Sequence, residues 1–224
     1  MTRLYKLLMA AGGVVLAAPL AFMAAERMTP AADHLDPPTR TDPAVDTNGP
    51  DVPADIADVY AWYTPTKVII AYTFAGPKLG DRPATYDRDV LYGINISNSG
   101  NKSAPTSAIR FRFGVDTSSG SPQYGVQVSG LPGVTGNIVG PVEQRLEKDG
   151  VIVQAGLFDD PFVFDLQGFR TTTATATLSF SNTRNFFATQ NDTAIVVEIP
   201  RDRLQSGTNP LGIYVTSARF GGNI

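Results

Sequence analysis

The sequence predicts an all-β protein, an antiparallel β-sandwich of jelly-roll-like type that follows an irregular segment rich in proline and aspartate. Apolar and polar residues alternate over several short stretches, as in strands that bury one face. Turn-forming stretches such as SNSGN, DTSSGSP and SGTNP separate them. Helical patterns are nearly absent, and only DPFVFDLQGF and RNFF are expected to form short helical turns.

The first three strands are expected between residues 59 and 96. VYAWY covers residues 59–63, a turn follows at Pro65, and the next strand covers residues 67–74. The third strand lies in DVLYGINISN. Apolar residues at every second position share one face of the second and third strands: Val68, Ile70, Tyr72, Phe74, Val90, Tyr92, Ile94 and Ile96.

The stretch AIRFRFGV has the clearest strand pattern. Ile109, Phe111, Phe113 and Val115 are expected to face the core, because arginines occupy the positions between the first three of them. Shorter runs rich in β-branched and aromatic residues predict the remaining strands. These are expected over residues 124–128, 151–155, 173–180, 194–199 and 212–217.

The N-terminal residues have the pattern of an export signal. Arg3 and Lys6 precede an uncharged run over residues 7–25. Residues 1–25 are interpreted as a signal peptide or, if they are not cleaved, as an N-terminal anchor, because the run is long enough to span a bilayer. Both interpretations predict a periplasmic or secreted protein. The chain contains no cysteine, so its core must be stable without disulfides.

Residues 26–58 form a segment, here called the strap, that precedes the expected sandwich of residues 59–224. Strap and sandwich are expected to form one domain. Prolines throughout the strap disfavour a helix. The strap also contains seven aspartates, at positions 33, 36, 42, 46, 51, 55 and 58. A disordered linker and a metal-binding segment are both compatible with this composition.

Charge limits the classes of partner. The net charge of −3 and a pI near 5.1 provide no positive field that would attract nucleic acid. Contact with a membrane is expected only through an uncleaved N-terminal segment. An unknown protein or a small ligand is the expected partner.

Three stretches resemble one bacterial family. DHLDPPTRTDPAVD, ADIADVYAWYTP and AGLFDDPFVFDLQGFR are similar to segments of domain of unknown function 4331. Phe158 departs from the pattern, since many members have arginine before the Asp-Asp pair. The order of the Trp-containing strand, AIVVEIPRDRL and GIYV is also similar, more loosely, to family 9 carbohydrate-binding modules. The first resemblance implies an exported protein of unassigned activity, and the second implies a sandwich.

The residue inventory limits the chemistry. Haem, zinc and copper sites use histidine, cysteine or methionine, but the chain has one histidine, no cysteine, and methionines only at positions 1, 9, 23 and 28. A calcium-like cation requires oxygen ligands. Asp55, Asp58, Asp159 and Asp160 are the candidate ligands, and Ca²⁺ is the candidate cofactor. The alternative is that these carboxylates cap turns by accepting backbone N–H bonds. In that case Phe162, Phe164 and Phe169, which follow Asp160, are expected to be core residues.

Two further residues are candidates for binding. His34, with Asp36 beside it, is interpreted as a clasp that ties the strap to the sandwich through hydrogen bonds; a metal ligand and a catalytic base are the alternatives. Trp62, with Tyr60, Tyr63 and Tyr72 nearby, is either a platform for a carbohydrate or small ligand or a core residue.

Three functional hypotheses follow. The first is an exported, non-catalytic binding or structural protein with a possible bound calcium-like cation. The second is a metal-assisted periplasmic enzyme that uses His34 and nearby aspartates. The third is a carbohydrate or small-ligand binding module that uses Trp62 and the tyrosines.

Overall fold

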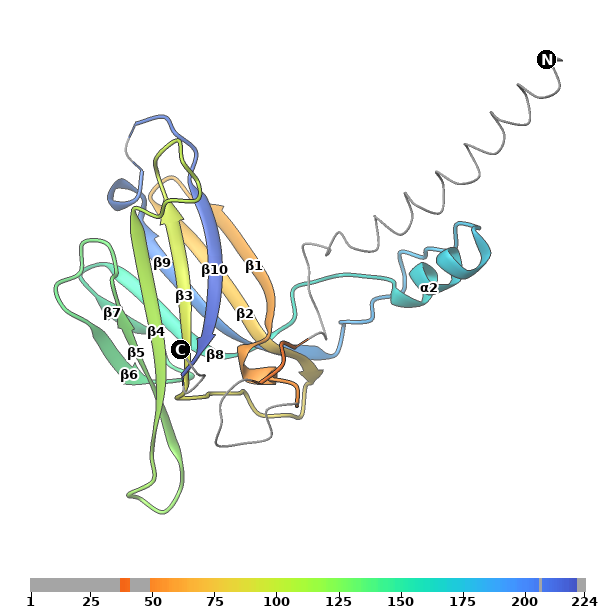
Figure 1. Ribbon diagram of the computed structural model, residues 1–224, viewed down its shortest axis with the longest axis horizontal. Helices are drawn as coiled ribbons and strands as arrows, with labels where there is room; N and C mark the ends of the chain where they lie inside the picture. Colours follow the sequence, from red (N-terminus) through yellow and green to blue (C-terminus); the bar gives the residue numbers. More distant parts are fainter. Residues whose placement is uncertain (1–36, 41–48, 206, 221–224) are drawn as a thin grey trace, which may run out of the picture. The chain divides into compact units, whose positions relative to one another are not determined.

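The computed structural model describes residues 37–40, 49–205 and 207–220 of the chain and contains two antiparallel five-stranded sheets (Figure 1). The strand order is β1-β2-β9-β8-β7 in one sheet and β10-β3-β4-β5-β6 in the other. The predicted all-β sandwich is therefore confirmed. Residues 1–25, His34 and Asp36 lie outside the described residues, so the predictions for them stay predictions.

The strands are β1 (Ile56–Tyr63), β2 (Lys67–Leu79), β3 (Val90–Ser97), β4 (Ser107–Asp116), β5 (Gln123–Ser129), β6 (Ile138–Pro141), β7 (Leu146–Lys148), β8 (Val151–Asp159), β9 (Gln190–Pro200) and β10 (Gly212–Arg219). The helices are η1 (Val52–Ala54), α2 (Leu166–Thr175) and η2 (Arg201–Arg203). Strand β1 begins before the expected start at residue 59. None of the helices in the part of the chain that the structure describes has the length and apolar character that a membrane span requires.

The core forms between the two sheets from the residues whose alternation the sequence displays. The alternating side chains of β2 and β3 are at most 5% exposed. In β4, Ile109, Phe111 and Phe113 are buried as expected, but Val115 is 46% exposed. Val115 pairs with Tyr124, itself 40% exposed, near the turn that joins β4 to β5. Val115 is therefore exposed because it lies near the end of the β4–β5 hairpin, beyond the buried part of the sheet.

Four aromatic rings lie at the centre of this core. Phe74 lies 4.2 Å from Tyr92 and 6.0 Å from Phe113 between ring centroids, and Tyr72 meets Phe74 at 5.6 Å. The two buried hydroxyls donate to backbone oxygens, Tyr72 to Thr216 at 3.3 Å and Tyr92 to a strap carbonyl at 2.7 Å. Burial raises the pKa of both phenols, so both stay neutral. Tyr72 is thus a core residue and not part of a ligand platform.

The described part of the strap is fixed to the sandwich by polar contacts. Asp51, at the start of η1, forms an ion pair with Arg219 of β10, whose guanidinium also contacts Asp87 at 2.9 Å. The Arg219 and Asp51 side chains are each 4% exposed. The Ser217 hydroxyl donates to the Ala54 carbonyl at 2.5 Å. These contacts attach Asp51 and Ala54 of the strap to β10.

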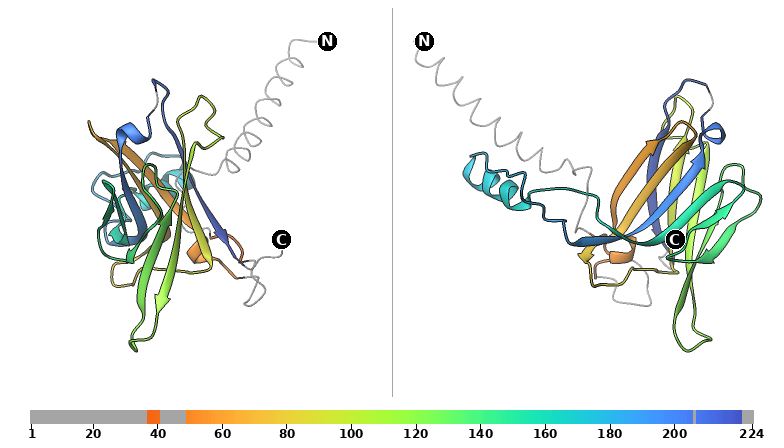
Figure 2. Two further views of the ribbon diagram at one scale, coloured as in Figure 1. Left: turned by 90° about the vertical axis from the view of Figure 1, so that its left-hand side faces the viewer. Right: turned by 180° about the vertical axis from the view of Figure 1, so that it is seen from behind.

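The strand predicted over residues 173–180 is wrong. Residues 160–189, here called the α2 excursion, connect β8 to β9 and contain α2, which belongs to neither sheet layer (Figure 2). Asp165 caps the helix by accepting the Gly168 N–H at 2.8 Å. The Thr172 and Thr175 hydroxyls donate to carbonyls four residues back. None of the strands that the structure describes pairs with this segment, so the β-propensity of its threonines does not lead to a strand.

Candidate functional site

A pocket of about 350 Å³ lies where β1 and β10, the edge strands that face each other across the two sheets, approach η2. Three strands and the segment between η2 and β10 contribute its walls. The lining residues are Ala61, Trp62, Tyr63, Val68, Arg201, Gln205, Pro210, Leu211 and Ile213. Among the strands that the structure describes, β1 pairs only with β2 and is therefore the edge strand of its sheet.

The register of β1 determines how its two aromatic residues are placed. Tyr63 pairs with Val68 and therefore shares the inner face of the sheet, whereas Trp62 pairs with Ile69 and shares the outer face. Trp62 is 50% exposed and Tyr63 is 72% exposed. The interpretation of Trp62 as a core residue is therefore wrong, because its side chain lies on the outer face of its sheet, away from the core between the two sheets.

Arg201 comes to this pocket through the chain reversal that ends β9. Its backbone N–H donates to the Thr66 carbonyl at 2.9 Å and so fixes η2 beside the β1–β2 turn. Its Nε donates to Gln205 Oε1 at 2.6 Å. The guanidinium carbon lies 5.2 Å from the centre of the Tyr63 ring. This is a cation–π arrangement in which two side chains hold the guanidinium in one orientation.

Arg201 and Gln205 were missed at the sequence level. Both belong to the IPRDRLQ stretch, which contains a strand end and three charged residues and carries no spacing typical of a binding motif. Only the fold brings them to Tyr63. The resulting pocket combines an aromatic face, aliphatic walls and one oriented cation, which suits a small molecule with both apolar and polar groups.

Two of the four candidate calcium ligands lie near one tyrosine. Asp58 accepts a hydrogen bond from the Tyr60 hydroxyl at 2.9 Å. Burial first, and then Asp58, Asp160 and Asp192, raise the pKa of Tyr60. These three aspartates are at most 8% exposed. Asp192 was missed, although an acid at the start of the apolar strand NDTAIVVEIP is a signal that could have identified it.

Asp160, Asp55 and Asp159, three of the candidate calcium ligands, lie at turns or at the ends of helices and strands. Asp160 Oδ1 accepts the Phe162 N–H at 2.8 Å, the turn interaction that was the alternative to metal binding. Asp55 ends η1, and its carbonyl accepts the Ala75 N–H at 3.0 Å. Asp159 is the last residue of β8. Within residues 37–40, 49–205 and 207–220, no group of three or more histidine, aspartate or glutamate side chains has the arrangement of a metal site.

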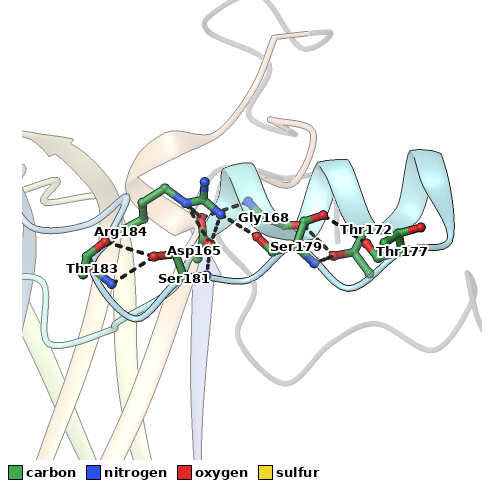
Figure 3. A network of polar contacts seen from close by, with 8 residues as sticks. All are labelled: Asp165, Gly168, Thr172, Thr177, Ser179, Ser181, Thr183 and Arg184. Atoms are coloured by element: carbon green, nitrogen blue, oxygen red, sulfur yellow. Dashed lines mark hydrogen bonds and ion pairs between the residues drawn. The ribbon is translucent and has the colours of Figure 1, made fainter.

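The α2 excursion has its own polar network (Figure 3). Asp165 accepts hydrogen bonds from Arg184 Nη2 at 2.7 Å, from the Ser181 N–H at 2.8 Å and from the Gly168 N–H. The Arg184 bond is the largest of the effects that lower the pKa of Asp165 to about 2. One carboxylate thus connects the start of α2 to the returning chain.

Apolar side chains of the excursion are only partly covered. Phe162 and Phe164, expected to be core residues, are half-buried, and Phe169 is 44% exposed. The rings of Phe162 and Phe164 stack at 5.8 Å. The prediction that these three phenylalanines belong to the main core is wrong, because the excursion leaves both sheets and forms a small aromatic cluster of its own.

Comparison of the chain with protein-family models, with curated proteins and with solved structures found no match. The resemblance to domain of unknown function 4331 therefore stays a prediction.

Proposed function

We propose that this protein is an exported, non-catalytic binding protein and that the pocket between β1, η2 and β10 is its ligand site. The observation that carries this proposal is that Trp62 and Tyr63 are exposed at a pocket that Arg201 also lines, with its guanidinium over the Tyr63 ring. The uncharged run over residues 7–25, preceded by two basic residues, supports export.

The energetics of the aromatic residues support a binding role. Burial of one large apolar side chain stabilises a fold by about 1.5–3 kcal/mol. The same chain buries Tyr72 and Tyr92 completely, yet leaves Trp62 and Tyr63, which are consecutive residues of β1, exposed. A pocket of about 350 Å³ is within the range of small-molecule sites. A ligand bound in the pocket would bury the apolar surface of Trp62 and Tyr63 that stays exposed in the folded protein.

Fluorescence of Trp62, the single tryptophan of the chain, tests the proposal. Titration with a set of aromatic acids, aromatic alcohols and oligosaccharides is expected to give a saturable change with at least one of them. Tyr63→Ala should weaken that binding about tenfold, because aromatic contacts contribute on the order of 1 kcal/mol or more. Tyr124→Ala, an exposed tyrosine on the other sheet, is the matched control. No saturable change with any compound contradicts the proposal.

A bound calcium ion, the cofactor that the sequence suggests, is a second candidate. Asp58, Asp160 and Asp192 are buried and all raise the pKa of Tyr60, but within the described residues they are not arranged as the ligands of one ion. A cation that binds only the folded state raises the melting temperature by mass action. The expected result is a higher midpoint in millimolar Ca²⁺ than in chelator, and a smaller difference for Asp58→Asn. Equal midpoints, together with no metal in elemental analysis, would exclude it. The metal-assisted enzyme stays a prediction, since His34 lies outside the described residues.

A further inference from the structure

We infer that the pocket selects a small organic anion, a carboxylate attached to a flat apolar body, over neutral compounds such as glycans. The inference rests on the proposed function and specifies the class of ligand. It follows from the donors that Arg201 leaves available, from the polarity of the pocket walls and from the charges nearby.

The guanidinium of Arg201 is held in one orientation, but most of its N–H donors make no hydrogen bond within the described residues. A guanidinium has five N–H donors, and among the described residues only the Nε–H donor of Arg201 has a partner, Gln205. The structure shows no ion pair between Arg201 and a carboxylate within the described ranges. The two Nη groups can therefore receive a carboxylate in the bidentate geometry that arginine favours.

The remaining walls do not suit a neutral sugar. Val68, Pro210, Leu211 and Ile213 supply aliphatic surface. Gln205 is the other polar side chain of the lining apart from the aromatic tips, and its oxygen already accepts from Arg201. Sugar hydroxyls that lose water without new partners oppose binding. An aromatic body instead matches the ring of Tyr63.

The charges around Arg201 add to this preference. A second depression shares Arg201 and Gln205 with the pocket and is lined by Lys67 and Asp202. Lys67 Nζ donates to the Gly150 carbonyl at 2.7 Å, and this second cation lines the same depression as Arg201. Asp202 is the opposing charge on η2. Two cations and one anion leave the local balance positive in a chain whose net charge is −3.

A matched pair of probes tests the inference. Calorimetric titration and Trp62 fluorescence would compare 2-naphthoate with 2-naphthalenemethanol, which has the same ring system and no charge. The unmodified protein is expected to bind the acid about tenfold tighter or more, because charge-assisted hydrogen bonds are the stronger class. Arg201→Gln should lower the affinity for 2-naphthoate to about that for 2-naphthalenemethanol. Arg203→Gln should preserve the preference, since it removes the same charge from η2 at a side chain that contacts the Pro132 carbonyl.

The outcomes separate the inference from the proposed function. Equal affinities of the unmodified protein for acid and alcohol overturn the inference and leave the ligand site standing. Binding of neither compound overturns the inference, and the proposed function is overturned as well only if no compound of the wider set, oligosaccharides included, binds. A preference that persists in Arg201→Gln overturns the assignment to this residue. The comparison in the unmodified protein does not depend on whether either variant folds, and thermal melting of the variants checks that they do.

Discussion

Arg219 shows how single residues attach the strap to the sandwich. Its side chain lies between Asp51 of the strap and Asp87, and hydrogen bonds to Asp51 are the largest cause that raises the pKa of Arg219. The sequence predicts His34 as the clasp between strap and sandwich. Among the described residues, the ion pair of Asp51 with Arg219 performs that role, and the role of His34 stays a prediction.

Arg219→Met is expected to destabilise the protein strongly. Removal of one partner from a buried ion pair leaves the other charges uncompensated and costs about 3–5 kcal/mol. Chemical denaturation measures the loss. Arg88→Met is the control, because Arg88 pairs with Asp89 at the surface with 74% of its side chain exposed. Its cost should stay below about 1 kcal/mol. Similar costs for both variants would contradict the assigned role of Arg219.

At the scale of elements, the α2 excursion is a closed insertion between two paired strands. Asp159 pairs with Asn191 at its base, and the Asp160 N–H donates to the Gln190 carbonyl at 2.9 Å. Farther out, Asp165 and Arg184 join the start of α2 to the returning chain. The excursion can therefore open at this ion pair while the strand pairing below it persists.

Acid is expected to loosen the excursion before the sandwich. The pKa of Asp165 is lowered to about 2, below the value of about 3.9 for an unfolded aspartate. Its contribution is thus complete above pH 4 and is lost as the pH falls toward 2. Hydrogen exchange of the α2 amides should accelerate between pH 4.5 and 2.5, after correction for intrinsic rates.

Asp165→Asn should give fast α2 exchange already at pH 4.5 and remove most of this pH dependence. Asp116→Asn is the control, because the pKa of Asp116 is also lowered, by the hydrogen bonds of Ser118, but in a distant hairpin. If Asp165→Asn and the unmodified protein exchange alike at both pH values, the carboxylate does not hold the excursion.

For the whole molecule, the sandwich was predictable because alternation is a local pattern with a period of two residues. The same rule failed for the threonine-rich residues 173–180, where no sheet neighbour exists. It also missed β6 and β7, which are too short to display alternation. The pocket between β1, η2 and β10 was only partly predictable. Trp62 and Tyr63 stood out by residue type, whereas Arg201 reaches them through the pairing of β2 with β9.

Mapping of 2-naphthoate binding by amide chemical shifts across the isotope-labelled protein tests the central claim most directly. A ligand in the pocket is predicted to shift the amides of Ala61, Trp62, Tyr63, Leu211 and Ile213 saturably and most strongly. The amides of α2 and of the β4–β5 hairpin should stay unchanged. Largest changes at the exposed phenylalanines of the α2 excursion, or no saturable change in any amide, would contradict the account.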